Sequence, residues 1–456
     1  MKVEEYLDKL GGQIRDKHAR QFVADEVRGH IEDQADFFEK EGMSREEALS
    51  EAVKEMGDPV SVGIELDKIH RPHMEWGFLG YVMFISFLSL AVQYLINRGI
   101  SNETDAGFIG APSWGYPLKI TAGLAAMLLI YRLDYTVLVG KGSLIGGLYL
   151  SMITVLSLLF GEQINGRVIS IRLSGFRISE FVLLLLYIPI FAAILYEYRG
   201  KGRSAAVKIL LWILAPTICQ FMIGYISLPI MLLLLISEMA LFALALNRNW
   251  YAVNKKRMLL CISGMLLIAL TIGLAVVWKF HDYQRARIEN WIAYYGRGNE
   301  AGADDQGINY VNSRLSAVFT HSNFIRKSDE AVEIMNELKP YQKDESVLAA
   351  IAANYGLIGA AAMVLCLFVL CVYIFRISRE QKNSLGYIIG CSSAVVIGLE
   401  CISNVLIISG ILPFTTSILP FFSDGAWVLL ANYVLLGLIL SIYRYKDIRQ
   451  ERAIKE

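Results

Sequence analysis

From Trp76 onward the chain alternates between long apolar runs and short polar segments, whereas residues 1–73 are crowded with charges. About ten of the runs approach the roughly 20 apolar residues that a helix needs to cross a hydrocarbon core about 30 Å thick. These runs begin near Trp76, Ile120, Ser143, Glu180, Val207, Ile226, Met258, Val347, Leu385 and Asp424. The pattern predicts an all-α polytopic membrane protein with about ten transmembrane helices.

Basic residues gather in alternate short loops, which indicates an orientation because cytoplasmic loops carry an excess of Lys and Arg. They are Arg199, Lys201, Arg203, Lys208, Arg248, Lys255, Lys256, Arg257, Arg376, Arg379, Lys382, Arg444, Lys446, Arg449 and Arg452. The loop at residues 410–422 on the other side has no basic residue. The longest loop, at about residues 280–345, is basic too, but long loops are translocated regardless of charge. We therefore expect both termini in the cytoplasm and the long loop outside.

Residues 1–73 are predicted to form a small cytoplasmic domain of three helices. Apolar residues recur at helical spacing along the first two, and Ser44 with Glu47 forms a capping box that opens the third. This third helix is expected to stop at Gly57-Asp58-Pro59. Residues 42–59 resemble the short prefix domain found ahead of many bacterial permease-like membrane proteins. That resemblance implies a cytoplasmic interaction module whose partner is unknown.

Composition excludes several classes of protein. Of the 456 residues, 55% are hydrophobic and only 19% are charged, which is too apolar for an ordinary soluble enzyme. The formal net charge is zero, so nothing argues for nucleic acid as a partner. The six cysteines lie inside apolar runs without close-spaced partners, and His281 and His321 lack metal-ligand spacing. No metal site is expected and no cofactor is assigned, although a divalent cation stays open.

Four stretches after Trp76 follow a known order of motifs. Residues 166–181 are similar to Gly-Gly-Phe-x-x-Gln-Pro-Ser-Glu-Phe-x-Lys, with Arg177-Ile178 in place of Gln-Pro and Leu183 in place of the lysine. Residues 283–288 and 307–313 are similar to an Arg-Ile pair followed by Gly-Tyr-Gln-x-x-Gln-Ser; the Gly-Ser-Gly-Gly that should come next is absent. Residues 344–359 resemble a segment with a catalytic aspartate and Glu-Leu-Gly-Leu-Ile-Gly.

The fourth stretch is the strongest match. It comprises Asn404, Gly410, Leu412-Pro413, residues 419–425 and residues 429–432, in register with Asn-x-Gly, Gly-Leu-Leu-Pro and Pro-Phe-x-Ser-Tyr-Gly-Gly. Asp424 replaces the tyrosine of that pattern and Ala426 its second glycine. With these motifs, residues 74–445 resemble the SEDS family (shape, elongation, division and sporulation; FtsW/RodA/SpoVE-like glycosyltransferases). Residues 446–456 form a basic cytoplasmic tail.

The resemblance implies a ten-helix fold in a bacterial cytoplasmic membrane and a role in cell-wall synthesis, cell shape or division. The implied reaction polymerises undecaprenyl-pyrophosphate-linked disaccharide, lipid II, at the outer face. A carboxylate would take the proton of an acceptor hydroxyl as the lipid pyrophosphate leaves. Counting back from Gly356 places Glu345 on the family's catalytic aspartate, with Asp344 one residue earlier. The implied partners are membrane lipids and a transpeptidase, a class B penicillin-binding protein.

The substrate-binding candidates come from the same motifs. Arg offers paired donors to phosphate oxygens, so the arginines of the outer loop are assigned to the pyrophosphate, and Arg177 is a substitute for the lysine missing at Leu183. The full set is Arg285, Arg287, Arg314, Ser313, Glu180, Arg177, Asn404 and Ser423.

Simpler interpretations stay open for each of these residues. Asp344 and Glu345 could be solvated carboxylates at a helix N-terminus, and the arginines ordinary loop charges. Acids within the apolar runs, namely Glu180, Glu238 and Glu400, are expensive in a bilayer and indicate either function or an interhelical hydrogen bond. The alternatives for the whole protein are a catalytically degenerate SEDS-like scaffold or precursor-binding protein regulated by its N-terminal domain, and thirdly a transporter.

Overall fold

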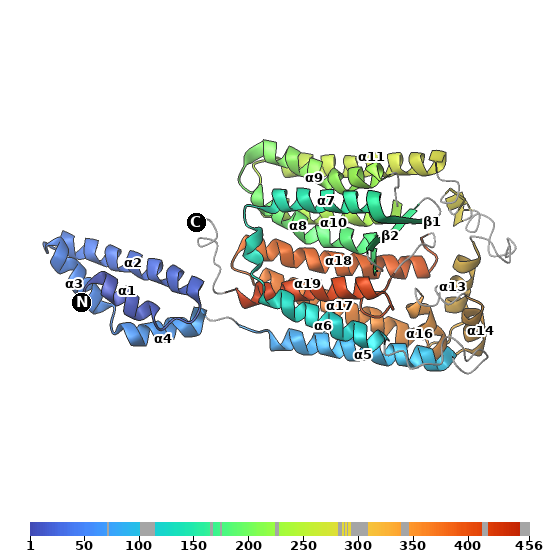
Figure 1. Ribbon diagram of the computed structural model, residues 1–456, viewed down its shortest axis with the longest axis horizontal. Coiled ribbons are helices and arrows are strands. Elements are labelled where there is room, and N and C mark those ends of the chain that lie inside the picture. The colour runs from blue at the N-terminus through green and yellow to red at the C-terminus, as the bar shows by residue number, and fades with distance from the viewer. Residues whose placement is uncertain are drawn as a thin grey trace.

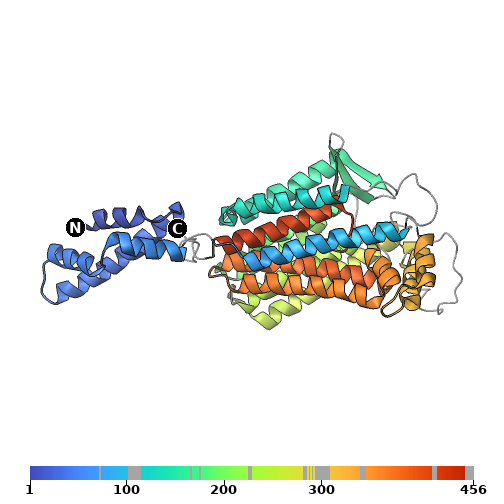
Figure 2. The same cartoon turned by 90° about the horizontal axis from the view of Figure 1, so that it is seen from below.

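The computed structural model describes two helical bodies, a small bundle formed by the N-terminal residues and a long bundle formed by the rest (Figure 1). The residues described are 1–70, 73–100, 115–164, 167–173, 176–223, 228–280, 285–286, 288–289, 291–292, 309–338, 346–412 and 418–446. Figure 2 shows the small bundle as a separate body at one end of the molecule.

The N-terminal bundle has four helices: α1 (Val3–Gly11), α2 (Lys17–Lys40), α3 (Arg45–Glu55) and α4 (Pro59–His70). The capping box is present, because Ser44 and Glu47 satisfy each other's backbone N–H groups. The prediction of three helices was wrong by one. Gly57, with φ +83°, does end α3. However, the Asp58 carboxylate then accepts from the Ser61 backbone N–H at 2.8 Å and caps a new helix whose first residue is Pro59.

In the part of the chain that the structure describes, the long bundle contains ten helices of membrane-spanning length. They are α5 (Trp76–Ile100), α6 (Gly115–Arg132), α7 (Gly142–Phe160), α8 (Glu180–Glu197), α9 (Gly202–Met222), α10 (Leu228–Asn247), α11 (Lys255–Phe280), α17 (Leu357–Arg379), α18 (Ser384–Ile408) and α19 (Ala426–Arg444). Among the described residues, nine helices are long and apolar enough to cross a membrane; α6 is the exception. This architecture confirms a polytopic all-α membrane protein.

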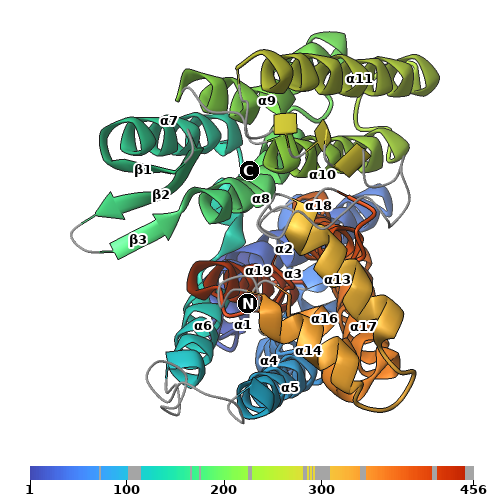
Figure 3. The same ribbon diagram turned by 90° about the vertical axis from the view of Figure 1, so that its right-hand side faces the viewer.

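The remaining long helix, α6, nevertheless runs with the others and packs along α19, as the end-on view shows (Figure 3). Two glycines make this close approach possible. A Cβ at Gly123 would collide with the Tyr433 ring, and a Cβ at Gly437 would lie 2.7 Å from the Met127 carbonyl oxygen. The charges Lys119 and Arg132 near the ends of α6 lower its hydropathy without removing it from the bundle.

The eighth apolar run, expected to be one helix from near Val347, is broken in two. It forms α16 (Val347–Tyr355) and α17, separated by Gly356 with φ +85°. The break arises because Leu357 and Ile358 donate their backbone N–H groups to the carbonyls of Asn323 and Phe324 in the long loop between α11 and α17. Gly356 thus ties this long loop to the membrane bundle.

Three short helices cover one end of the long bundle. They are α13 (Asn309–His321), α14 (Asp329–Glu337) and α16, and we call this end the capped end. A small antiparallel sheet lies at the same end, with strands β1 (Gly161–Ile164), β2 (Arg167–Leu173) and β3 (Phe176–Ser179) in that order. The all-α prediction did not include this sheet.

The opposite end, which faces the N-terminal bundle, collects the basic loops. The guanidinium of Arg199 donates to Ser384 Oγ at 2.8 Å, and Lys446 bonds the Glu380 carboxylate at 3.2 Å. The backbone N–H of Gly200 donates to the Trp250 carbonyl at 2.9 Å. The turns after α8, α10 and α17 and the end of α19 therefore meet there, so the basic residues of these segments that the structure describes occupy one end of the protein.

Candidate functional site

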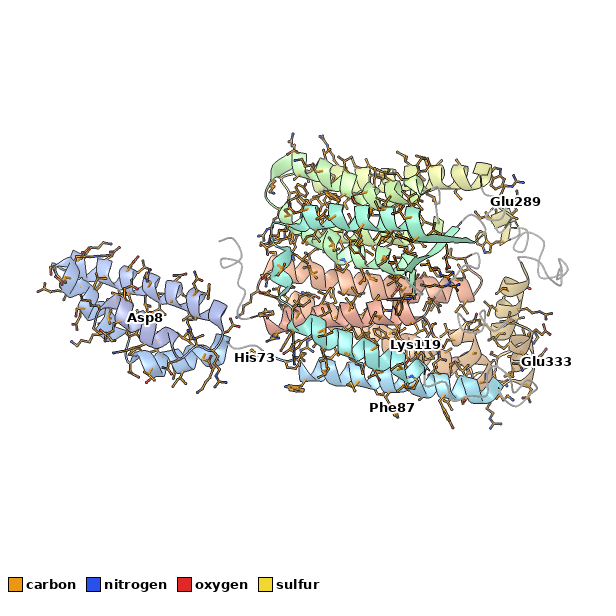
Figure 4. The ribbon with its side chains drawn as sticks, viewed as in Figure 1. Asp8, His73, Phe87, Lys119, Glu289 and Glu333 are labelled. Atoms are coloured by element: carbon orange, nitrogen blue, oxygen red, sulfur yellow. The ribbon has the colours of Figure 1, made fainter. Side chains whose placement is uncertain are left out.

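The candidate residues that the structure describes come from several elements at or near the capped end. Figure 4 shows Glu289 and Glu333 at this end of the molecule, far from Asp8 in the N-terminal bundle, with Lys119 between them. The elements are β3, the start of α8, the second half of α18, the turn before α19, and α13. Each contributes a polar group to a region otherwise built from apolar helices.

The turn before α19 is held rigidly by two neighbouring helices. Phe421 takes φ +65°, which is uncommon for a residue with a side chain. Its carbonyl accepts hydrogen bonds from Tyr116 Oη of α6, at 2.8 Å, and from Ser89 Oγ of α5. Gln93, one helical turn beyond Ser89, donates to the Phe422 carbonyl at 2.6 Å. These buried bonds explain why the Pro-Phe-Phe-Ser stretch keeps one backbone conformation.

Within this turn, Ser423 and Asp424 have different partners. The Ser423 hydroxyl is buried and accepts the Leu419 backbone N–H at 3.0 Å. The Asp424 carboxylate bonds Lys119 Nζ of α6 at 2.5 Å, and both side chains are about one-third exposed. The sequence interpretation missed Lys119, Ser89 and Gln93. Signals were present, because a lone lysine in an apolar helix and polar residues four apart on an apolar helix both indicate a shared contact.

Glu180 is the first residue of α8 and is buried. It precedes an apolar cluster in which Val182 of α8 packs against Val428 and Ala431 of α19, flanked by Ile418. The cluster joins the start of α8 to the turn that carries Ser423. Two of the predicted substrate-binding positions, Glu180 and Ser423, therefore belong to segments that pack together through this apolar cluster.

Asn404 and Glu400 lie one turn apart on α18, and both are buried. The carboxyl group of Glu400 lies beside the Asn432 amide of α19. Neither carboxylate oxygen of Glu400 nor the amide nitrogen of Asn432 has a hydrogen-bond partner among the residues described, so the interhelical hydrogen bond expected for Glu400 is not formed. Glu238 is elsewhere, near the middle of α10 and close to Tyr187 of α8. Its carboxylate oxygens are fully buried and have no hydrogen-bond partner among the residues described. These acids do not form one site.

Of the predicted arginines of the long loop between α11 and α17, the two that the structure describes form ion pairs. Arg285 bonds Glu289 four residues later at 3.2 Å, and its guanidinium lies 5.8 Å from the Trp278 ring centroid. Arg314 bonds Glu337 at 2.8 Å and so joins α13 to α14. Ser313, its neighbour, is half-buried on α13. Arg287 lies outside the described residues.

The two predicted catalytic carboxylates, Asp344 and Glu345, also lie outside the described residues. The residue that follows them, Ser346, is fully buried and precedes α16. The first seven residues of α16 are buried as well, since the helix packs against α13, α14, α17 and α5. Within the described ranges, no group of three or more His, Cys, Asp or Glu side chains has an arrangement that could hold a metal ion.

Arg177, the last predicted position, belongs to β3. Its Nε lies 3.1 Å from the Glu162 carboxylate of β1, and 65% of its side chain is exposed. It thus lies at the capped end on the outer side of the sheet, beside the start of α8.

Comparison with known proteins identifies the architecture. RodA of Mycobacterium tuberculosis, named a peptidoglycan glycosyltransferase, is 26% identical over 343 residues, which are 70% of this chain and 68% of that protein. FtsW of Enterococcus hirae, named a probable peptidoglycan glycosyltransferase, is 25% identical over 338 residues, 71% of this chain and 81% of that protein.

Solved structures agree in fold. A chain from the work described as "Structural coordination of polymerization and crosslinking by a peptidoglycan synthase complex" is 20% identical and superposes with a TM-score of 0.62. The match covers 83% of this chain and 99% of that one. The family model described as a cell cycle protein, FtsW/RodA/SpoVE, matches residues 116–448. Since that match spans well over half of the sequence, this multi-pass membrane protein belongs to the FtsW/RodA/SpoVE family.

Proposed function

We propose that this protein is a peptidoglycan glycosyltransferase that polymerises a lipid-linked disaccharide at its capped end. The observation that carries the proposal is the family match over residues 116–448, which extends from α6 past the end of α19 and includes the sheet and the cap. The relatives from M. tuberculosis and E. hirae are named for this reaction.

In the proposed reaction, Glu345, or Asp344 beside it, takes the proton from an acceptor sugar hydroxyl. The oxygen then attacks the donor anomeric carbon, the bond from that carbon to the pyrophosphate oxygen breaks, and the lipid pyrophosphate leaves. What supports this assignment is the setting of Ser346, which directly follows the carboxylates and is buried where α16 begins.

Substrate contacts are proposed for the residues around this end. Glu180 and Ser423 flank the apolar cluster of α8 and α19, and Asn404 lies deeper on α18. Of the two predicted loop arginines that the structure describes, Arg285 is the better placed for a pyrophosphate, because a half-exposed pair four residues apart on a helix is weak and readily exchanged. The Arg314–Glu337 bond holds two cap helices together, so Arg314 would act only if that bond opened.

We further propose that both termini are cytoplasmic and that the capped end faces outward. The gathering of basic loops at the opposite end supports this orientation, because such loops are retained in the cytoplasm. A crosslinking partner, a transpeptidase, is proposed from the peptidoglycan synthase complex to which the fold is similar. Reporter fusions at the C-terminus and in residues 293–308 test the orientation: cytoplasmic activity only from the first is expected, and the reverse pattern would contradict it.

A second candidate function is a family member that binds the precursor without polymerising it. It is favoured by Leu183 at the position of the family's lysine and by Asp424, which is paired with Lys119 where the family pattern has a tyrosine. The deciding experiment supplies labelled lipid-linked disaccharide to the purified full-length protein, alone and with candidate transpeptidases. Polymer made by the wild type supports the glycosyltransferase. No polymer from a well-folded preparation with any partner supports the precursor-binding function.

A further inference from the structure

The sheet at the capped end presents two arginines that no step above fully uses. Arg172 of β2 and Arg177 of β3 are directly opposite each other in the antiparallel register. Like charges at such a position repel and destabilise a sheet. The repulsion is offset by Glu162 of β1, whose two carboxylate oxygens each accept one guanidinium, from Arg172 and from Arg177, both at 3.1 Å.

The three side chains lie on one face of the sheet because side chains alternate along a strand. Ser170 shares that face and donates its hydroxyl to Glu162 at 3.0 Å, so the carboxylate is held from three directions. The other face carries Ile171 and Ile178, which are paired across the strands, and the sheet packs against α7 and α8. The sheet is therefore a small amphipathic platform at the ends of two membrane helices.

The guanidinium groups retain most of their binding capacity. Each uses one nitrogen on Glu162, and no further partner for either occurs in the described part of the chain. The side chains are 60% and 65% exposed, and the cluster as a whole carries one net positive charge. Two adjacent planar forks with free donors match the oxygens of a phosphate group better than they match a single carboxylate.

The surroundings indicate a lipid rather than a soluble anion. Phe176, beside Arg177, is 69% exposed, and the last turn of α7 exposes Leu158, Leu159 and Phe160. A charged pair next to exposed apolar side chains at a helix end matches the level of lipid headgroups. Figure 3 shows the sheet at the periphery of the bundle beside α7, where a lipid can approach from the bilayer.

We propose that Arg172 and Arg177, oriented by Glu162, form a binding site for the phosphate headgroup of a membrane lipid. This inference rests on the proposed function only for the choice of one probe, a polyprenyl pyrophosphate. If the protein is a glycosyltransferase, this site lies beside the start of α8.

The test titrates detergent-purified full-length protein with undecaprenyl pyrophosphate, or separately with phosphatidylglycerol, and counts bound lipid by native mass spectrometry. The double variant Arg172→Gln/Arg177→Gln should bind about ten-fold more weakly, which is the effect expected for charge-assisted hydrogen bonds lost at a half-exposed site. Replacing both arginines with lysine should give an intermediate loss, because the charge stays and the paired donors do not. Arg203→Gln removes an exposed charge at the opposite end and should bind like the wild type.

If the glutamine variant loses binding of undecaprenyl pyrophosphate more than binding of phosphatidylglycerol, the precursor lipid is the ligand of the site. If it loses binding of both lipids equally, the site exists and its ligand is bulk phospholipid. Binding of both lipids at wild-type strength by the folded glutamine variant overturns the proposal; if that variant does not fold, the lysine variant decides. Polymerisation by the same proteins separates the two hypotheses. If the wild type makes polymer and the glutamine variant binds lipid as the wild type does, only the lipid-binding proposal is refuted. If lipid binding depends on the arginines but the wild type makes no polymer, only the proposed function is refuted.

Discussion

Substitution of Gly356 by alanine tests how the long loop between α11 and α17 is joined to the membrane bundle. Gly356 has φ +85° and ψ 169°, a region that residues with a side chain rarely occupy. A Cβ at this position would lie 2.7 Å from both the Phe324 carbonyl oxygen and the Ile325 carbonyl carbon. Those are backbone atoms held by the hydrogen bonds from Leu357 and Ile358, so they cannot swing aside.

The magnitude has two parts. Holding a residue with a side chain in this region costs about 1–3 kcal/mol. Forcing the 323–325 backbone away from α17 adds an overpacking penalty of about 1–3 kcal/mol. We therefore expect Gly356→Ala to lower the free energy of unfolding by roughly 3 kcal/mol, which is about a hundred-fold in the unfolding equilibrium. The midpoint of thermal unfolding should fall by several degrees.

The assay is thermal unfolding of the detergent-purified protein, followed by tryptophan fluorescence. Gly398→Ala is the matched control, because a Cβ there meets only the Cys371 sulfur at an ordinary 3.8 Å inside α18. Because alanine is the better helix former, this variant should be as stable as the wild type or more stable by up to about 1 kcal/mol. If the two variants unfold at the same temperature, the junction at Gly356 does not have the strained, close-packed geometry described above.

Other predictions concern the turn before α19 and the N-terminal bundle. Gln93→Leu should destabilise the protein by about 1–3 kcal/mol, because it leaves the buried Phe422 carbonyl without its hydrogen-bond donor. The control Tyr94→Leu, on the exposed side of α5, should not destabilise it. Equal thermal midpoints of the two variants would contradict this prediction. A double-mutant cycle with Lys119→Gln and Asp424→Asn should give a coupling free energy of about 1 kcal/mol or less in the stability of the protein. This coupling should weaken as salt is added, as expected for a partly exposed ion pair. A coupling that does not depend on salt would show that the pair is more deeply desolvated. In α3, hydrogen bonds from Ser44 hold the pKa of Glu47 below its ordinary value of 4.5. The stabilisation is therefore present at neutral pH and lost as the pH falls through and below 4.5. Hydrogen exchange of α3 in the full chain, corrected for intrinsic rates, should show this loss in the wild type and much less of it in Ser44→Ala; identical pH profiles would refute the role of the capping box.

Much of the architecture could be predicted because a bilayer imposes a strong local pattern. Apolar runs of helical length indicate α5, α7 and the other spans without any tertiary information. The division at Gly356 could not be predicted in this way, since it depends on backbone contacts with residues 323–324 of the outer loop. The fourth N-terminal helix was missed because Pro59 was interpreted as an end, although proline also suits the first position of a helix.

The residues of the candidate site were also predicted only in part. The order of the motifs indicated Glu180, Asn404 and Ser423, and all three residues are buried. They lie on α8, on α18 and in the turn before α19, and these three helices pack against one another. Their supporting partners were not predicted, because Lys119 and Asp424 are separated by 305 residues and only the fold brings them together. Arg177 was among the predicted residues, but its neighbour Arg172 was missed, although Ser170 and Arg172 alternate with Ile169, Ile171 and Leu173 in a period-two pattern. A strand of this length between two membrane helices is easily overlooked.

The most direct test of the central claim is polymerisation of labelled lipid-linked disaccharide by four purified full-length proteins: the wild type, Glu345→Ala, Asp344→Ala and Glu333→Ala. Glu333 is an exposed acid of α14 at the same end, so its variant controls for the loss of a negative charge. We predict that the wild type and Glu333→Ala make polymer and that Glu345→Ala does not; loss only in Asp344→Ala would move the base by one residue. Equal polymer from all four proteins, or none from folded wild type with any transpeptidase, would contradict the account.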